Sequence, residues 1–113
     1  MHVTLYHNPR CSKSRAAKQL LEEQGVEFKI VEYLDQPPSV ADLEALLRKL
    51  GCSAFDMRRP KEAREAGIEH LKGNDLLHAL TRNPRALQRP ILVVGDRAVI
   101  GRPPELILDL LPG

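Results

Sequence analysis

A cysteine lies among basic and hydroxylic residues near the start of the chain, in the stretch HNPRCSKSR. Cys11 follows the β-forming segment HVTLY and precedes the helical segment AAKQLLEEQG. The start of a helix presents unpaired backbone N–H groups and the positive end of the helix dipole, and both stabilise an anion. Only the thiolate is a good nucleophile, and an ordinary thiol is mostly protonated at neutral pH. We therefore expect Cys11 to be a nucleophile with a lowered pKa.

The neighbours of Cys11 support this hypothesis. Ser12 and Ser14 can donate hydrogen bonds to the sulfur or to a bound oxyanion. Nearby positive charge comes from Arg10, Lys13 and Arg15, with His7 a few residues upstream. An isolated cysteine at a strand–helix junction is more often a small buried residue, and these neighbours favour the reactive alternative.

Other cysteine chemistries fit the sequence less well. Ser14 occupies the second position of a C-x-x-C pair, so an intramolecular dithiol of the thioredoxin kind is excluded. If Cys11 does redox chemistry, we expect the second thiol to come from outside. Ala17 stands where the cysteine phosphatase loop needs arginine. Cys52 follows an apolar helix and is interpreted as packed or incidental. No metal site is expected, because no compact ligand spacing links the cysteines to His2, His7, His70 or His78.

Composition is typical of a globular protein. The chain has 113 residues, 42% apolar and 28% charged, with a formal net charge of +2. This charge gives no reason to expect nucleic-acid binding. The sequence has neither a membrane-length apolar run nor the apolar core of a signal peptide, so we expect a cytoplasmic protein with free thiols. We also expect a monomer.

The spacing of the apolar residues predicts that the chain begins with a β-α-β unit. It consists of a strand at 2–7, a helix from Ser12 to a stop at Gly25, and a parallel strand at 27–33. Ser39 then begins a helix with a capping-box spacing, and the segment 54–72 predicts one or two short helices.

The remaining pattern predicts a β-β-α unit. Asn74 is expected to cap a further helix that ends near Asn83-Pro84. Strands at 91–94 and 98–101 are joined by a tight turn in GDR, and Pro103 and Pro104 open a last helix. This order predicts an α/β thioredoxin-like fold with a mixed four-stranded sheet. We expect one domain, 1–113, with a helical insertion at about 39–88.

Several arginines lie next to proline at the ends of predicted elements. They are Arg89 in QRPI, Arg102 in GRPPE, and Arg58 or Arg59 in DMRRPKE. Each could be a surface cation. If the fold brings them together at the thiolate, their guanidinium groups would bind a tetrahedral oxyanion.

The motifs YHNPRCSKSR, YLDQPP, RPILVV and GRPPE occur in an order and at spacings that resemble the glutaredoxin-coupled arsenate reductase family (ArsC). The resemblance spans the whole chain. It implies that Cys11 attacks arsenate and that Arg89 and Arg102 hold the oxyanion. Pro90 would take a cis peptide bond. The residues that would tune the thiol are His7, Ser14 and Arg15. For the family's first arginine we favour Arg58 over Arg59.

The resemblance also implies that no cofactor is bound, that glutathione is a co-substrate and that glutaredoxin is a partner. Two alternatives remain open. A regulator of the Spx type would bind RNA polymerase, although such proteins generally use a C-x-x-C switch. A glutathione-dependent thiol reductase would act on a substrate other than arsenate.

Overall fold

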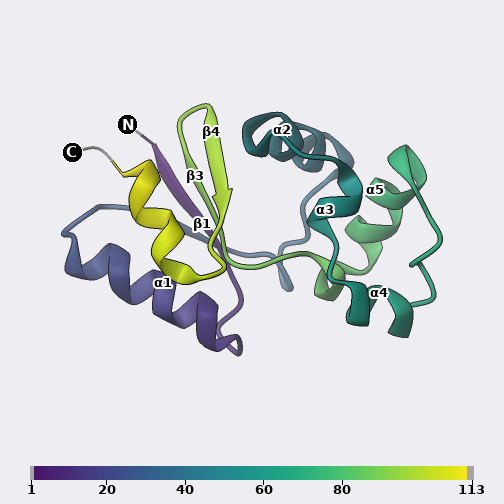
Figure 1. The fold of residues 1–113 in the computed structure, drawn as a ribbon, viewed down its shortest axis with the longest axis horizontal. Helices are drawn as coiled ribbons and strands as arrows, with labels where there is room; N and C mark the ends of the chain where they lie inside the picture. Colours follow the sequence, from purple (N-terminus) through teal and green to yellow (C-terminus); the bar gives the residue numbers. More distant parts are fainter. Residues whose placement is uncertain (1, 112–113) are drawn as a thin grey trace. The chain divides into compact units, whose positions relative to one another are not determined.

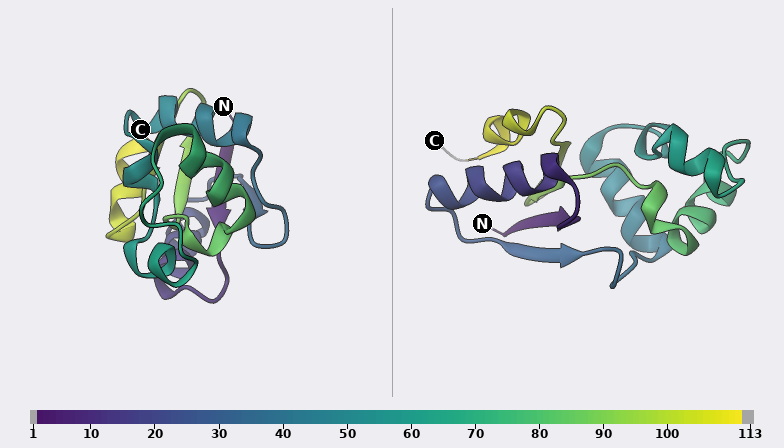
Figure 2. Two further views of the ribbon diagram at one scale, coloured as in Figure 1. Left: turned by 90° about the vertical axis from the view of Figure 1, so that its right-hand side faces the viewer. Right: turned by 90° about the horizontal axis from the view of Figure 1, so that it is seen from below.

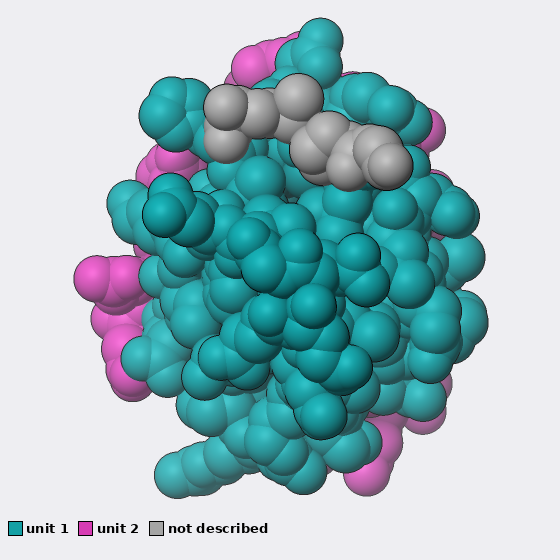
Figure 3. Space-filling view, turned by 90° about the vertical axis from the view of Figure 1, so that its left-hand side faces the viewer, with its two compact units in different colours: residues 1–33, 89–113 teal, residues 34–88 magenta. Residues whose placement is uncertain are grey.

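The computed structural model describes residues 2–111, and the chain divides into two compact units. Unit 1 comprises Met1–Tyr33 and Arg89–Gly113, and unit 2 comprises Leu34–Gln88 (Figure 3). Unit 2 covers the insertion expected at about 39–88. That the chain forms a single domain stays a prediction. Within the described residues, no helix is both long and apolar enough to cross a membrane.

Unit 1 is built on a mixed sheet of four strands. Its elements are β1 (Val3–His7), α1 (Ser12–Glu23), β2 (Lys29–Glu32), β3 (Ile91–Val94), β4 (Arg97–Ile100) and the 3₁₀ helix η2 (Pro104–Leu110). The strand order is β2-β1-β3-β4. Figure 1 labels β1, β3 and β4 of this sheet. The β1–β2 pair is parallel, and the β1–β3 and β3–β4 pairs are antiparallel. The predicted fold class is therefore confirmed.

One face of this sheet carries the core of unit 1. Val3 and Leu5 of β1 pair with Val94 and Leu92 of β3, and all four are buried. The core residues from the covering helices are Ala17 and Leu21 of α1 and Ile107 of η2. Both helices therefore lie against the same face, with α1 running beside β1 (Figure 2). This packing fixes the start of α1 near the end of β1.

The elements of unit 1 differ from the expected ones in detail. β2 is shorter than 27–33, because β1 offers pairing partners only to Lys29–Glu32. The β3–β4 turn consists of Gly95 and Asp96 alone, with φ of 61° at Gly95, and Arg97 already pairs with Val94. The last helix is a 3₁₀ helix, in which the Leu106 N–H donates to the Pro103 carbonyl at 3.1 Å.

Unit 2 is helical. Its elements are α2 (Val40–Leu50), α3 (Ala54–Met57), α4 (Pro60–Glu65), α5 (Gly73–Arg82) and the 3₁₀ helix η1 (Pro84–Ala86). The capping box of α2 is present, with Ser39 and Asp42 exchanging hydrogen bonds of 3.0 Å. The prediction that Asn74 caps α5 is wrong. The Leu76 N–H donates to the Lys72 carbonyl at 3.2 Å, so the helix begins before Asn74, which lies in its first turn.

Gly101 lies at a close approach within unit 1. A Cβ atom at this position would be 3.0 Å from both Ile107 Cγ2 and Pro90 Cγ. We predict that Gly101→Ala destabilises the protein by about 1–3 kcal/mol, because neither neighbour can move without disturbing the core or the Pro90 segment. Urea unfolding followed by circular dichroism measures the effect. A midpoint equal to that of the wild type would contradict the prediction.

Candidate active site

The loop between β1 and α1 is held by its own hydrogen bonds. Asn8 Oδ1 accepts from the Arg10 N–H and the Asn8 carbonyl accepts from the Cys11 N–H, each at 3.0 Å. Arg15 Nη1 donates to the Pro9 carbonyl, also at 3.0 Å. Cys11 is the N-cap residue of α1, with extended φ and ψ angles of −92° and 122°. A rigid loop therefore places the Cys11 sulfur at the N-terminus of the helix.

A buried hydrogen-bond network lies beneath this loop. Ser14 is fully buried, and its hydroxyl accepts from the Asn8 N–H at 3.0 Å and shares a 2.6 Å hydrogen bond with His7 Nδ1. Burial lowers the pKa of His7, and the charge of Lys18 lowers it further, while Glu32 opposes the shift. The ring is therefore neutral at pH 7, and its Nδ1 can accept a hydrogen bond from the Ser14 hydroxyl. The network ties α1 to the end of β1.

The Cys11 thiol has a lowered pKa. Burial raises this pKa, but the backbone N–H groups of Ser14 and Lys13, together with a hydrogen bond and the positive charge from Arg89, outweigh it. Among the described residues, the thiol makes no cap hydrogen bond of ordinary geometry. The effect of the two N–H groups on the pKa of Cys11 is therefore mainly electrostatic. The direction agrees with the expectation for a nucleophilic cysteine.

The sheet brings Arg89 to Cys11. β3 runs antiparallel to β1, and its first residue, Ile91, pairs with Tyr6 near the end of β1. The segment that precedes β3 therefore lies beside the segment that follows β1. Arg89 and Cys11, far apart in the sequence, are thereby brought within hydrogen-bond reach of each other.

A second segment, which contains Gly101 and Arg102, is hydrogen-bonded to the main chain of Arg89 and Pro90. The Arg89–Pro90 and Arg102–Pro103 peptide bonds are both cis. The Gly101 N–H donates to the Pro90 carbonyl, and Arg102 Nη1 donates to the Arg89 carbonyl, each at 2.9 Å. Of the residues predicted to bind an oxyanion, Arg89 and Arg102 are thus in direct contact.

The other predicted residues have distinct positions. His7 and Ser14 belong to the buried network, and the guanidinium of Arg15 is bound to the loop carbonyl of Pro9. Ser14 acts on the sulfur through its N–H group, since its hydroxyl contacts His7 and Asn8. Their roles in catalysis stay predictions.

Arg58 and Arg59 lie in unit 2 and differ in their partners. Arg59 Nε forms a 3.1 Å ion pair with Glu62. The Arg58 guanidinium lies 3.9 Å above the Phe55 ring centroid, and its buried Nε has no hydrogen-bond partner among the described residues. The choice of Arg58 over Arg59 as a ligand for an oxyanion stays a prediction.

The Cys52 thiol and possible metal ligands are two further candidates for parts of the site. Burial, and then the charge of Asp56, raise the pKa of Cys52, so that thiol is a weak nucleophile. Within residues 2–111, no three metal-ligating side chains lie close enough together to hold a metal ion.

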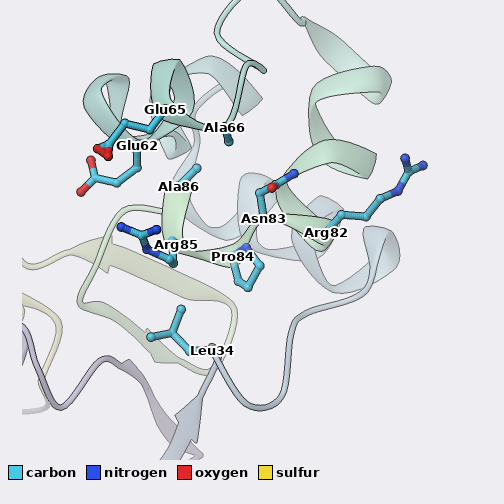
Figure 4. A pocket seen from close by; sticks show the side chains of 9 residues that line it. All are labelled: Leu34, Glu62, Glu65, Ala66, Arg82, Asn83, Pro84, Arg85 and Ala86. Carbon is cyan, nitrogen blue, oxygen red and sulfur yellow. The ribbon is translucent and has the colours of Figure 1, made fainter.

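Unit 2 also contains a pocket of about 500 Å³ (Figure 4). Its lining includes the carboxylates of Glu62 and Glu65, the guanidinium of Arg85 and apolar groups such as Leu34. Glu62 is already paired with Arg59. No residue predicted to act in thiol or oxyanion chemistry lines this pocket.

Sequence reasoning missed two residues of the site, Asn8 and Gly101. An asparagine between a strand and a proline, as in HNPR, is a signal for an Asx turn, and this signal could have identified Asn8. The role of Gly101 depends on its contact with Pro90, which only the fold creates.

We predict that Arg89→Gln raises the pKa of Cys11, because it removes both a charge and a hydrogen bond from the thiolate. Thiolate absorbance against pH measures the change. Arg97→Gln is a matched control, since it removes the same charge from an exposed position at the far end of the β3–β4 hairpin. Equal effects of the two substitutions would show that net charge, and not the contact, sets the pKa.

We predict that Ser14→Ala lowers the free energy of unfolding by about 1–3 kcal/mol, because it leaves the buried Asn8 N–H and His7 ring without their partner. Ser12→Ala, at an exposed position, should change it by less than about 0.5 kcal/mol. The Ser14 N–H remains in the variant, so the pKa of Cys11 should change less than in Arg89→Gln. A large rise in that pKa with unchanged stability would mean that the hydroxyl acts directly on the sulfur.

Comparison with known proteins identifies relatives along nearly the whole chain. The model of the ArsC family matches residues 6–110. An arsenate reductase of Neisseria meningitidis serogroup A is 44% identical over 114 residues, which cover 96% of this chain and 97% of the relative. The uncharacterized protein YfgD of Escherichia coli K12 is also 44% identical, with 96% of each chain covered.

Solved structures agree with this result. An arsenate reductase from Vibrio cholerae matches with a TM-score of 0.90 and 40% identity, and the match covers 98% of each chain. Similarity in sequence and similarity in structure thus both extend over nearly the whole chain. The chain belongs to the ArsC family and has its thioredoxin-like fold.

Proposed function

We propose that this protein reduces arsenate to arsenite, with Cys11 as the nucleophile and with glutathione and glutaredoxin as the source of electrons. The observation that supports this most strongly is a thiol of lowered pKa in contact with Arg89. The contact combines a nucleophile with a cation that can hold an oxyanion. Membership of the ArsC family and the names of relatives such as the Neisseria meningitidis enzyme favour arsenate as that oxyanion.

The first step is a substitution without electron transfer. The Cys11 thiolate attacks arsenic, an S–As bond forms, and one arsenate oxygen leaves as water after protonation. Arsenic remains As(V). Arg89, Arg102 and Arg58 would stabilise the negative charge on the remaining oxygens, the kind of electrostatic stabilisation that usually contributes most at such sites.

The second step transfers two electrons. A glutathione thiolate attacks the Cys11 sulfur, the S–As bond breaks, and its electron pair stays on arsenic, which leaves as arsenite. Cys11 is now joined to glutathione in a mixed disulfide. A glutaredoxin thiolate attacks the glutathione sulfur and releases the Cys11 thiolate for the next cycle. This reaction needs the reducing conditions of the cytoplasm.

Arsenate-dependent NADPH oxidation, coupled through glutathione, glutaredoxin and glutathione reductase, tests this proposal. We expect Cys11→Ser to lower turnover by at least about a thousandfold, because no other group can form the S–As bond. Cys52→Ser is the matched control and should keep most of the activity, since the pKa of Cys52 is raised.

Turnover that survives in Cys11→Ser would refute the mechanism. If the wild type is inactive although its Cys11 thiol is intact, arsenate is not the substrate. A capture experiment with RNA polymerase subunits, and assays with other substrates of glutathione-dependent reductases, would then test the two alternatives.

A further inference from the structure

Arg102 makes a contact that oxyanion binding does not require. Its half-buried side chain donates from Nη1 to the main-chain carbonyl of Arg89 at 2.9 Å. Arg102 follows β4 and Arg89 precedes β3, so the contact joins the two segments that flank the β3–β4 hairpin. A guanidinium has five N–H donors, so this hydrogen bond leaves others free.

The neighbouring residue reinforces this contact. The Gly101 N–H donates to the Pro90 carbonyl at 2.9 Å, and the missing side chain of Gly101 makes room for the Pro90 ring. The carbonyls of two successive residues, Arg89 and Pro90, are therefore both held by the segment Gly101 and Arg102. Pro90 has no N–H group, so its carbonyl is the only backbone group through which it can form a hydrogen bond.

We propose that Arg102 is a positioning residue, which acts on the Cys11 thiolate by fixing the main chain of Arg89. The direction of the Arg89 side chain depends on the position of its own backbone. Once the Arg102 hydrogen bond is lost, the Arg89 guanidinium no longer stays in place beside the sulfur. This role is separate from any contact with an oxyanion, and only its catalytic meaning rests on the proposed function.

A double-mutant cycle on Arg89 and Arg102 tests the proposal. The pKa of Cys11 is measured by thiolate absorbance and, independently, by the pH dependence of iodoacetamide alkylation. Neither arsenate nor a thiol donor is present, so the result does not depend on whether the protein reduces arsenate. The proteins are the wild type, Arg89→Gln, Arg102→Gln, the double variant and the control Arg97→Gln.

We expect Arg102→Gln to raise the pKa by about half or more of the rise in Arg89→Gln. We expect the double variant to show no further rise beyond Arg89→Gln, because residues that act through one contact are not additive. Should Arg102→Gln fail to fold, Arg102→Met keeps the aliphatic stem and replaces it in the cycle.

Two results would overturn the proposal. Additive rises would show that Arg102 acts on the thiolate by its own charge. An unchanged pKa in a folded Arg102→Gln protein would show that the hydrogen bond to the Arg89 carbonyl has no effect on the thiol.

Discussion

The site depends on one electrostatic constraint, the stabilisation of a partly buried thiolate. Burial works against the charge on Cys11, so donors must compensate for it. They come from two segments far apart in the sequence: the N–H groups of Lys13 and Ser14 at the start of α1, and Arg89 before β3. The antiparallel pairing of β3 with β1 brings these segments together. The sheet register is therefore as important to the chemistry as the helix.

The charges on α1 support the same conclusion. Helices are stabilised by acidic residues in the first turn and basic residues in the last, and α1 has neither. Its first turn carries Lys13 and Arg15, and its last turn carries Glu22 and Glu23. Each reversal costs roughly 0.3–1 kcal/mol at an exposed position. As a result, positive charge gathers at the end of the helix where Cys11 lies, and this charge favours an anion there.

The sequence was sufficient to predict the fold class, the strand positions within a few residues and the lowered pKa of Cys11. These depend on local signals, namely the alternation in β1, the apolar run in β3 and a cysteine at the start of a helix. The start of α5 was mispredicted, because backbone hydrogen bonding begins at Lys72 and bypasses the capping preference of Asn74. The contact of Arg102 with Arg89 could not be predicted from the sequence either, because it depends on two segments being adjacent in space.

The position of Ser14 excludes a C-x-x-C dithiol at the start of α1. In a C-x-x-C protein this position would hold the second thiol. Here it holds a buried hydroxyl that accepts from the Asn8 N–H and bonds to His7. Sulfur is a weak acceptor and larger than oxygen, so a cysteine could not hold the loop with the same short hydrogen bonds. A rigid loop at the nucleophile and an internal dithiol thus compete for one position. This chain has the hydrogen-bonded loop, and the proposed reduction therefore uses an external thiol.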